Sequence, residues 1–393
     1  MTTGLERFAL SSVFTDDMWN LVRDSRNVDV MLDASVGQIR GEEGRVTSVD
    51  VDHRRAARFS VQASVFVLAA SGFENPRLLL GANGGDGIGN RHDNVGRYHM
   101  DHLRTVGGRL TPHDPALIDG MGEFDIRADV DDPTTWRMGR LTPTPAAMAR
   151  LELPHSAAQL LPKLAQPELE AVSAAKDAVR SLPRLRRPIR TAGLRDVLPG
   201  LARVATTAAR MSIAQRRIPP RTDAGWSGLA GSRGPWGSFA VEHQVEQFPD
   251  PDNRLYLDDR CDEFGRRRIS LDWKWSRAEM DGLQRTQQLF VDAFERSGVA
   301  TYDPVPWSTP PELTTPGGSF HPSGGTRMHA SPRHGVVDAD CQVHDWSNLF
   351  VAGSSTFPTV GYANPTLTII ALSLRLGDEI SRRLRKAAPA TDR

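Results

Sequence analysis

The stretch Asn348-Leu-Phe-Val-Ala-Gly-Ser-Ser-Thr-Phe-Pro-Thr-Val-Gly-Tyr-Ala-Asn-Pro-Thr-Leu-Thr-Ile-Ile-Ala371 decides the fold of this chain. Its first part, Leu349–Ala352, is a short apolar run that stops at Gly353 and predicts a strand. A strand that ends in glycine and small hydroxyl residues lets another backbone or a ligand come close. Asn364 and Pro365 predict a helix start, with asparagine at the N-cap position and proline just inside the helix. The apolar residues that follow have helical spacing, at Leu367, Ile370, Ala371 and Leu374.

A Gly-rich turn before this stretch carries a histidine, in the run His321-Pro-Ser-Gly-Gly-Thr-Arg-Met328. A helix that starts near Asn364 points free N–H groups at whatever lies before it, which suits an electron-rich ring or an anion. Histidine is the usual general base near neutral pH, and asparagine can both donate to and accept from a hydroxyl. We therefore hypothesise that His321 and Asn364 flank a bound ligand. The alternative is that His321 is an ordinary surface or core histidine.

Composition narrows the class of protein. At 393 residues the chain is long enough for two domains, and its 48 basic and 48 acidic residues give no sign of nucleic acid as a partner. The two cysteines, Cys261 and Cys341, fit no metal spacing, so a reducing compartment is the simplest setting. No apolar run approaches the roughly 20 residues of a membrane span, and the N-terminus lacks the pattern of a signal peptide. We predict a soluble, cytoplasmic protein without an integral membrane segment.

The first hundred residues alternate between strand and helix patterns. A helix is expected at 15–26, and the three strands of a meander at 28–39, 45–51 and 57–62. The continuous apolar run 64–70 predicts a strand buried on both faces. It ends at Ser71-Gly72, and Asn75-Pro76 predict the start of the next helix. A strand, a glycine turn and a helix in this order form a nucleotide site at the carboxyl edge of a parallel sheet.

The middle of the chain predicts a second sheet. Residues 103–150 are mixed strand and loop, whereas 155–217 predict a helical insertion that includes Gln159–Leu164 and is rich in arginine after residue 180. An anionic surface, a membrane headgroup layer or a partner subunit would suit that insertion. The simpler interpretation is a solvated cap, because prolines interrupt any long amphipathic helix. Strands are expected at 238–247, 253–257 and 268–273, and an amphipathic helix at 279–297.

Several of these runs resemble the glucose-methanol-choline (GMC) family of FAD-dependent oxidoreductases. The C-terminal signature matches from His321 to beyond Ala371 with its gaps in register, and further matches lie at 64–80, 94–102, 246–254 and 271–273. Where the family usually has glycine, this chain has Ser71. The resemblance implies an α/β (α+β) fold. Residues 1–102 and 321–385 would form an incomplete Rossmann-like FAD-binding domain, and 103–320 an antiparallel-sheet substrate-binding domain that carries the helical insertion.

The resemblance also implies a chemistry. Hydride passes from an alcohol carbon to the flavin of FAD, His321 removes the hydroxyl proton, and Asn364 orients the hydroxyl. The physical logic agrees, since proton removal during hydride loss needs a neutral imidazole within hydrogen-bond reach. The pairing of histidine with asparagine is similar to the sugar-oxidising branches of the family and implies a sugar, glycoside or polyol substrate. The implied flavin contacts are Ala352, Gly353, Pro365 and Thr366, and Val36 and Ala70 would lie near the adenosine.

Three neighbouring histidines, His92, His99 and His102, raise the question of a metal. Zinc sites in proteins combine histidine with cysteine or carboxylate ligands at short spacings, and no such cluster completes this one. We predict no metal site.

One element of the family pattern is missing. No strand is followed by a G-x-G-x-x-G turn and a helix to hold the FAD pyrophosphate, because Gly84–Gly89 follows a predicted helix. On domain-size priors, roughly 150–200 residues would supply that unit. The alternatives to an active enzyme are a fragment, a decayed copy, or a non-catalytic or split-enzyme subunit that needs an N-terminal FAD-binding chain. A membrane-associated dehydrogenase subunit that passes electrons to a haem or quinone in an electron-acceptor subunit is a weaker alternative.

Overall fold

The computed structural model describes residues 1–9, 13–54, 57–129, 131–132, 135–165, 236–305 and 318–387. The chain divides into two compact units, each assembled from three segments. Unit 1 comprises Met1–Ser25, Thr105–Gln244 and Gly282–Thr309, and unit 2 comprises Arg26–Arg104, Val245–Asp281 and Pro310–Arg393. The predicted FAD-binding and substrate-binding domains have other bounds and stay predictions.

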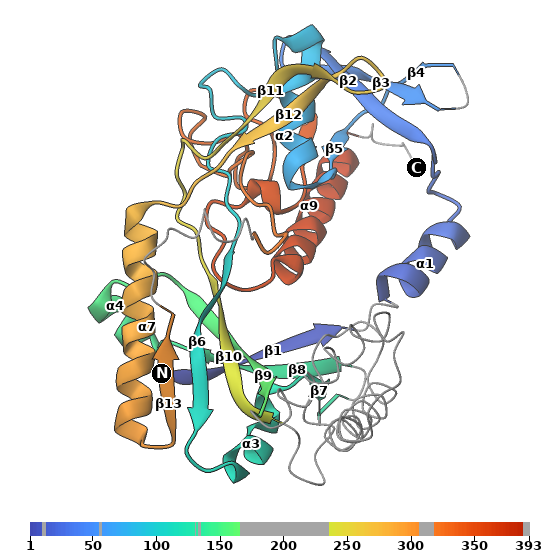
Figure 1. The fold of residues 1–393 in the computed structure, drawn as a ribbon. Helices are drawn as coiled ribbons and strands as arrows, with labels where there is room; N and C mark the ends of the chain where they lie inside the picture. The colour runs from blue at the N-terminus through green and yellow to red at the C-terminus, as the bar shows by residue number, and fades with distance from the viewer. Residues whose placement is uncertain are drawn as a thin grey trace, which may run out of the picture. The chain divides into compact units, whose positions relative to one another are not determined.

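Unit 1 is built around a seven-stranded sheet with strand order β1-β8-β9-β10-β6-β13, in which β7 pairs with β8 (Figure 1). The pairs β1–β8, β8–β9 and β6–β13 are antiparallel. The strands are β1 (Thr2–Ala9), β6 (Leu103–Pro112), β7 (Arg127–Ala128), β8 (Thr135–Thr142), β9 (Ser156–Leu164), β10 (Trp236–Val245) and β13 (Ala300–Pro304). The short helices are α1 (Met18–Asp24), α3 (Ala116–Gly120) and α4 (Pro145–Leu151).

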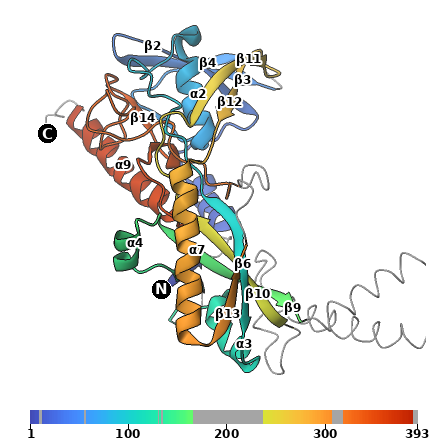
Figure 2. The same ribbon diagram turned by 60° about the vertical axis from the view of Figure 1, so that its left-hand side comes forward.

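The long helix α7 (Arg277–Ser297) lies along this sheet beside β6 and β13 (Figure 2). Phe290 and Phe294 of the helix are buried in one cluster with Leu110, Phe239 and Tyr302 of the strands. The apolar residues recur at helical spacing on one face, and burying that face stabilises the helix against the sheet. The helix predicted at 279–297 is confirmed.

The described residues of unit 2 include three small sheets and two α-helices (Figure 1). The strands β2 (Ala34–Glu42), β3 (Arg45–His53) and β4 (Phe59–Val61) form the predicted antiparallel meander. The strands β5 (Phe66–Leu68) and β14 (Leu349–Val351) pair in parallel, and β11 (Arg254–Cys261) forms a separate hairpin with β12 (Arg267–Asp272). The helices are α2 (Ser71–Gly81) and α9 (Thr366–Ala387).

The core of unit 2 lies between the meander, α2 and the parallel strand pair. It buries apolar side chains from all three, among them Ile39, Val46, Phe66, Leu79 and Leu349. On its other side β14 contacts α9, since Phe350 is buried with Leu376. This packing holds the carboxyl ends of β5 and β14 next to the start of α9. Among the described helices, none is both long and apolar enough to cross a membrane.

The predicted helix at Gln159–Leu164 is wrong, because these residues belong to strand β9. Ala158 and Leu160 are both buried in the core of unit 1, which is the two-residue period of a strand. Pro162 would also break a helix at this point. The remainder of the predicted insertion, 166–217, lies outside the described residues.

Two boundary predictions and one burial prediction in unit 2 are also wrong. The strand expected from residue 28 begins only at Ala34, and the apolar side chains before it are exposed. Strand β5 is not buried on both faces, since Val67 is 43% exposed. Helix α2 begins at Ser71 rather than at Asn75, because the side chain of Asn75 is engaged elsewhere, as described next.

Candidate active site

The candidate site lies at the edge where the two parallel strands of unit 2 end. Leu349, Phe350 and Val351 pair in register with Phe66, Val67 and Leu68. The N–H of Ala352 then donates to the carbonyl of Leu68 at 2.8 Å, so both strands end at the same level. In open α/β sheets, ligands bind at such carboxyl edges. The predicted strand at Leu349–Ala352 and its glycine stop are therefore confirmed.

The side chain of Asn75 ties this edge together. Its Oδ1 accepts the N–H of Ala70 at 2.8 Å, which fixes the chain just after β5. Its Nδ2 donates to the carbonyl of Ala352 at 3.0 Å and to Oγ of Ser355 at 2.9 Å, which fixes the chain just after β14. Asn75 and Ser355 are fully buried. One amide thus satisfies three polar groups that would otherwise be costly to bury.

A cavity of about 670 Å³ opens at this edge. Its lining includes six of the predicted site residues, namely Ala70, His321, Ala352, Gly353, Pro365 and Thr366. The size is that of a typical cofactor or ligand pocket. The structure therefore brings these six residues around one space, although they come from three distant segments.

Gly353 shapes one wall of the cavity. Its φ of +112° lies in a region that residues with a side chain rarely adopt. A Cβ added there would meet only Nδ2 of Asn75 within 4 Å, at 3.9 Å, so the glycine leaves the space in front of it open. The chain thus turns away from β14 without filling the cavity.

Helix α9 begins at the same cavity. The N–H of Ile369 donates to the carbonyl of Pro365 at 2.9 Å, so the helix starts at Thr366 and the N–H groups of its first turn have no helical partner. Asn364, the predicted N-cap, is exposed and lies one position before the observed cap position at Pro365, and it does not line the cavity. The helix prediction is confirmed with a start one residue later.

His321 is held by two residues that precede β6. The carboxylate Oδ1 of Asp101 accepts the backbone N–H of His321 at 3.1 Å, of Ser319 at 3.2 Å and of His102 at 2.7 Å. The Nδ1 of His102 lies 3.1 Å from the Nδ1 of His321, and the rings meet edge to face. His321 is half-buried and His102 is completely buried. The histidine side chain is therefore anchored at one nitrogen, which leaves Nε2 for another partner.

Burial dominates the protonation of this pair. Burial, together with the neighbouring His321, lowers the pKa of His102 to about 4. Burial also lowers the pKa of His321, although the charge of Asp101 opposes the effect and Arg104 adds to it. Both imidazoles are consequently neutral near pH 7, which is the form that a general base needs.

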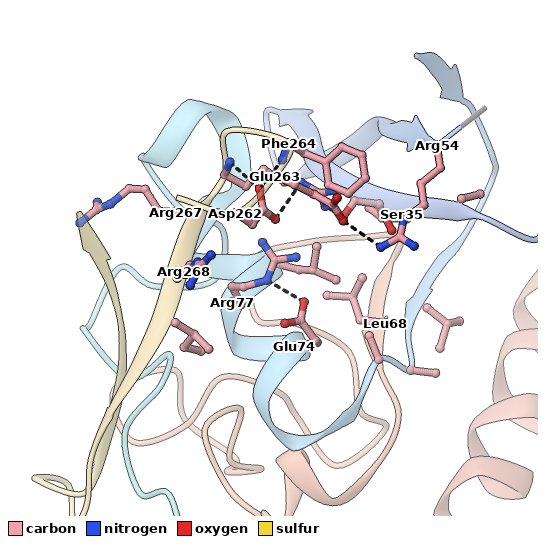
Figure 3. A pocket seen from close by; sticks show the side chains of 18 residues that line it. Ser35, Arg54, Leu68, Glu74, Arg77, Asp262, Glu263, Phe264, Arg267 and Arg268 are labelled. Atoms are coloured by element: carbon pink, nitrogen blue, oxygen red, sulfur yellow. Dashed lines mark hydrogen bonds and ion pairs between the residues drawn. The ribbon is translucent and has the colours of Figure 1, made fainter. Parts of the chain in front are cut away.

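A second cavity of about 730 Å³ adjoins the first (Figure 3). The two cavities share Ala69 and Ala70 in their linings, and the second also includes Val36. Charged side chains line its rim and form ion pairs with one another, with Arg54 at 2.8 Å from Glu263 and Arg77 at 2.6 Å from Glu74. A long ligand could therefore extend from one cavity into the other past the end of β5.

The histidines weighed for a metal site do not come together in the described residues. His99 stacks on Phe73 with ring centroids 5.3 Å apart. The side chains with metal-ligand spacing in this part of the chain are Asp101, His102 and His321, whose ligand atoms lie within 4.8 Å of one another. The two Nδ1 atoms face each other and Oδ1 of Asp101 accepts backbone N–H groups, whereas Nε2 of His102 is buried and makes neither of these contacts. The absence of a metal stays a prediction.

Sequence reasoning missed the residues that support the site. Asp101 and His102 lie in the matched run 94–102, so the resemblance marked the segment but not its role. Asn75 was predicted to start a helix, whereas its side-chain amide donates a hydrogen bond to the carbonyl of Ala352, which is 277 residues away in the sequence. The available signal for Asn75 was a short polar side chain in the helix that follows β5.

The described residues form an α/β fold with a cavity at the carboxyl ends of two parallel strands. Residues 249–373 match the family model described as GMC oxidoreductase. The chain therefore contains the C-terminal region of the GMC oxidoreductases, and the resemblance is confirmed.

Comparison with individual proteins extends the likeness over most of the chain. The fructose dehydrogenase large subunit of Gluconobacter japonicus is 26% identical over 348 residues, which are 88% of this chain and 52% of that protein. The 2-methyl-1,2-propanediol dehydrogenase of Mycolicibacterium austroafricanum is 26% identical over 377 residues, which cover 90% of this chain and 54% of that protein. This chain thus spans about half the length of these relatives.

A solved structure shows the same fold. Pyridoxine 4-oxidase from Mesorbium loti aligns with a TM-score of 0.50 and 16% identity, covering 92% of this chain and 60% of that one. At this identity the likeness concerns the fold alone. It agrees with the predicted mixed α/β architecture.

Proposed function

We propose that this chain forms the substrate-oxidising part of an FAD-dependent oxidoreductase that acts on the CH–OH group of an alcohol. The observation that carries the proposal is the place of His321, a neutral and anchored imidazole in the wall of a cavity where two parallel strands end and a helix begins. Membership of the GMC oxidoreductases over residues 249–373 supports the same chemistry.

The residues present fit FAD at both of its ends. At the flavin end, Ala352 and Gly353 form a wall of the cavity with little side-chain bulk. Pro365 and Thr366 place the N-terminus of α9 in the same cavity, and the partial positive charge of a helix N-terminus suits an electron-rich ring. At the adenosine end, Val36 and Ala70 line the adjoining cavity. The shared wall at Ala69 and Ala70 gives an elongated dinucleotide a continuous path. When bound, FAD would accept the hydride of the alcohol carbon.

The chain's own residues handle the proton. His321 takes the hydroxyl proton at its free nitrogen as the carbon loses hydride, which leaves a carbonyl product. Asn364, directly before Pro365, offers an amide that orients the hydroxyl without competing for its proton. Burial lowers the pKa of His321, so the imidazole is ready to accept a proton at neutral pH.

A sugar, glycoside or polyol is the proposed substrate class. Two relatives, a fructose dehydrogenase and a 2-methyl-1,2-propanediol dehydrogenase, are named for a polyhydroxy and a dihydroxy compound. The first of them is named a large subunit, which favours an electron-accepting partner for this chain as well.

Replacement of His321 tests the proposal. In the FAD-loaded protein, His321→Ala should slow flavin reduction by the alcohol by roughly 10²- to 10⁴-fold, the usual contribution of a general base. The flavin absorption should stay with the protein. His92→Ala, a change at an exposed histidine, serves as the matched control and should leave the rate unchanged. An unaltered rate in His321→Ala would remove this residue from the role of base.

A second candidate is a subunit that binds FAD only together with a partner carrying a nucleotide-binding βαβ unit. An apolar stripe on α9 favours it, since Leu367 and Leu374 are 79% and 68% exposed and Ile370 lies between them on the same face. Parallel sheets are normally covered by helices on both faces, yet Val67 of β5 is exposed. If this candidate is correct, Leu367→Glu and Leu374→Glu should abolish partner binding in gel filtration, while Leu376→Ala, on the buried face, should act through stability.

A further inference from the structure

Phe320 combines two unfavourable features directly beside His321. Its side chain is 94% exposed, so the ring has almost no packing against the described residues. Its φ of +59° lies in the left-handed region, which is unfavourable for a bulky residue. An exposed apolar ring on a strained backbone does not stabilise the free chain. Outliers of this kind are concentrated at functional sites, where the strain serves the function.

The other aromatic residue with a positive φ in the described part of the chain is accounted for by its contacts. Tyr98 has a φ of +60°, and the guanidinium of Arg327 covers its ring, with Cζ 4.4 Å from the ring centroid. A cation–π contact of this kind offsets a backbone cost. The ring of Phe320 has no comparable cover within the described residues.

Asp101 fixes the backbone on both sides of Phe320. Its Oδ1 accepts the N–H of Ser319 at 3.2 Å and the N–H of His321 at 3.1 Å. The positive φ of Phe320 lets the chain turn so that both N–H groups reach one oxygen. One carboxylate therefore fixes the positions of the aromatic residue and of the histidine relative to each other.

The ring of Phe320 belongs to the candidate cavity. Phe320 and His321 both line the cavity of about 670 Å³ at the ends of the parallel strands. Because the ring is exposed and also lines the cavity, it lies where the cavity meets solvent. A substrate whose hydroxyl reaches His321 therefore has this ring as an immediate neighbour.

A polyhydroxy compound has a surface that complements the ring. One side of a sugar ring or polyol chain presents C–H groups, and covering them with an aromatic ring gains hydrophobic and dispersion energy. We infer that Phe320 is a substrate-binding residue whose ring packs against the C–H face of a sugar or polyol while one hydroxyl lies at His321. The inference rests on the proposed function for the substrate class. It goes beyond that function by naming the residue that recognises the carbon skeleton.

Saturation-transfer NMR reads this contact without catalytic turnover. The full chain, in the presence of FAD, is irradiated at its aromatic protons, and methyl β-D-glucopyranoside in excess is the probe. The expected result is stronger transfer to the C–H protons of one ring face of the sugar than to those of the other. Equal transfer to both faces, or no transfer at all, would overturn the inference.

Three substitutions separate the ring from the backbone that carries it. Phe320→Gly and Phe320→Ala remove the ring and should weaken binding of the sugar about tenfold, the effect of losing roughly 60 Å² of apolar contact. Phe320→Tyr keeps the ring and should bind the sugar as the parent does. Binding by the glycine and alanine variants as tight as that of the parent would contradict the inference.

Stability provides a readout that a packing role would move in the opposite direction. Phe320→Gly should leave the urea midpoint at or above that of the parent, because glycine adopts a positive φ without steric cost. Phe320→Ala should leave the midpoint unchanged. A clear fall in the midpoint of both variants would mean that the ring supports the fold, and the inference would fail.

Kinetics of the FAD-loaded protein add an independent measurement. Phe320→Gly should raise KM for the sugar about tenfold and leave kcat within about twofold, because the lost contact is made equally in the ground state and the transition state. A fall in kcat with an unchanged KM would count against a binding role. If His321→Ala does not slow flavin reduction, the proposed function fails, while saturation transfer still decides whether Phe320 binds the sugar.

Discussion

Asn75 offers a stability prediction with a magnitude that the structure sets. Asn75→Leu fills a similar volume but removes all three hydrogen bonds, at 2.8, 2.9 and 3.0 Å. Each buried hydrogen bond contributes about 1 kcal/mol net, so the substitution should lower the free energy of unfolding by about 3 kcal/mol. The Ala70 N–H and the Ala352 carbonyl are left without their partner. The carboxyl ends of β5 and β14 lose the group that holds them together.

Equilibrium urea denaturation, followed by circular dichroism, measures this loss. With an m-value of about 2 kcal/mol/M, the midpoint of the transition of unit 2 should fall by about 1.5 M. Gln288→Leu makes the same exchange at an exposed amide that donates to Asp292 at 2.7 Å, and it should stay within about 0.5 kcal/mol of the parent. A midpoint for Asn75→Leu as close to the parent as that of the control would refute the reasoning.

Three further outcomes are expected. Ser71→Gly should raise the free energy of unfolding by about 0.5–1 kcal/mol, because the φ of +92° at Ser71 is more costly for a residue with a side chain than for glycine. The control Ala70→Gly, at an ordinary φ of −100°, should not stabilise the protein. The urea midpoint should fall between pH 6.5 and 4, because burial lowers the pKa of His99 and of His102 to about 4. The unfolded chain binds protons in that window and the folded chain does not, so stability is present above pH 6.5 and is lost on acidification. Prolonged EDTA treatment should leave flavin reduction unchanged, since Oδ1 of Asp101 and Nδ1 of each histidine already have partners in the only cluster of the described residues with metal-ligand spacing.

Each of these has a result that would count against it. A Ser71→Gly midpoint at or below that of the parent would mean that the positive φ is not costly. A pH-independent midpoint, or one that His99→Phe does not make less pH-dependent, would show that buried neutral histidines do not control acid stability. Activity lost to EDTA and restored by zinc would establish a metal role.

The parts of the site that were predictable are those with local causes. An apolar run that stops at Gly353, and an Asn364-Pro365 pair before helical spacing, specify a strand end and a helix start from a few neighbouring residues. These local signals are enough to identify two walls of the cavity from the amino-acid sequence. Helix α9 begins one residue later than the sequence predicts, which is within the usual variation of assigned helix ends.

The parts that were not predictable depend on distant partners. The contact of His102 with His321 spans 219 residues and that of Asn75 with Ala352 spans 277. Nothing in the local sequence states which nitrogen or carbonyl a polar side chain will meet. Strand β9 gives the same lesson, since the helix predicted at Gln159–Leu164 is replaced by a strand that buries Ala158 and Leu160 in the sheet of unit 1.

The central claim is that the two adjoining cavities of unit 2 hold FAD, and the absorption spectrum of the purified chain tests it most directly. After incubation with FAD and gel filtration, flavin bands should elute with the chain, and Gly353→Val, which fills the open wall at a φ of +112°, should lose them. A parent chain that elutes colourless, with all flavin in the small-molecule fraction, would contradict the claim for this chain alone and turn the search to a partner that completes the site.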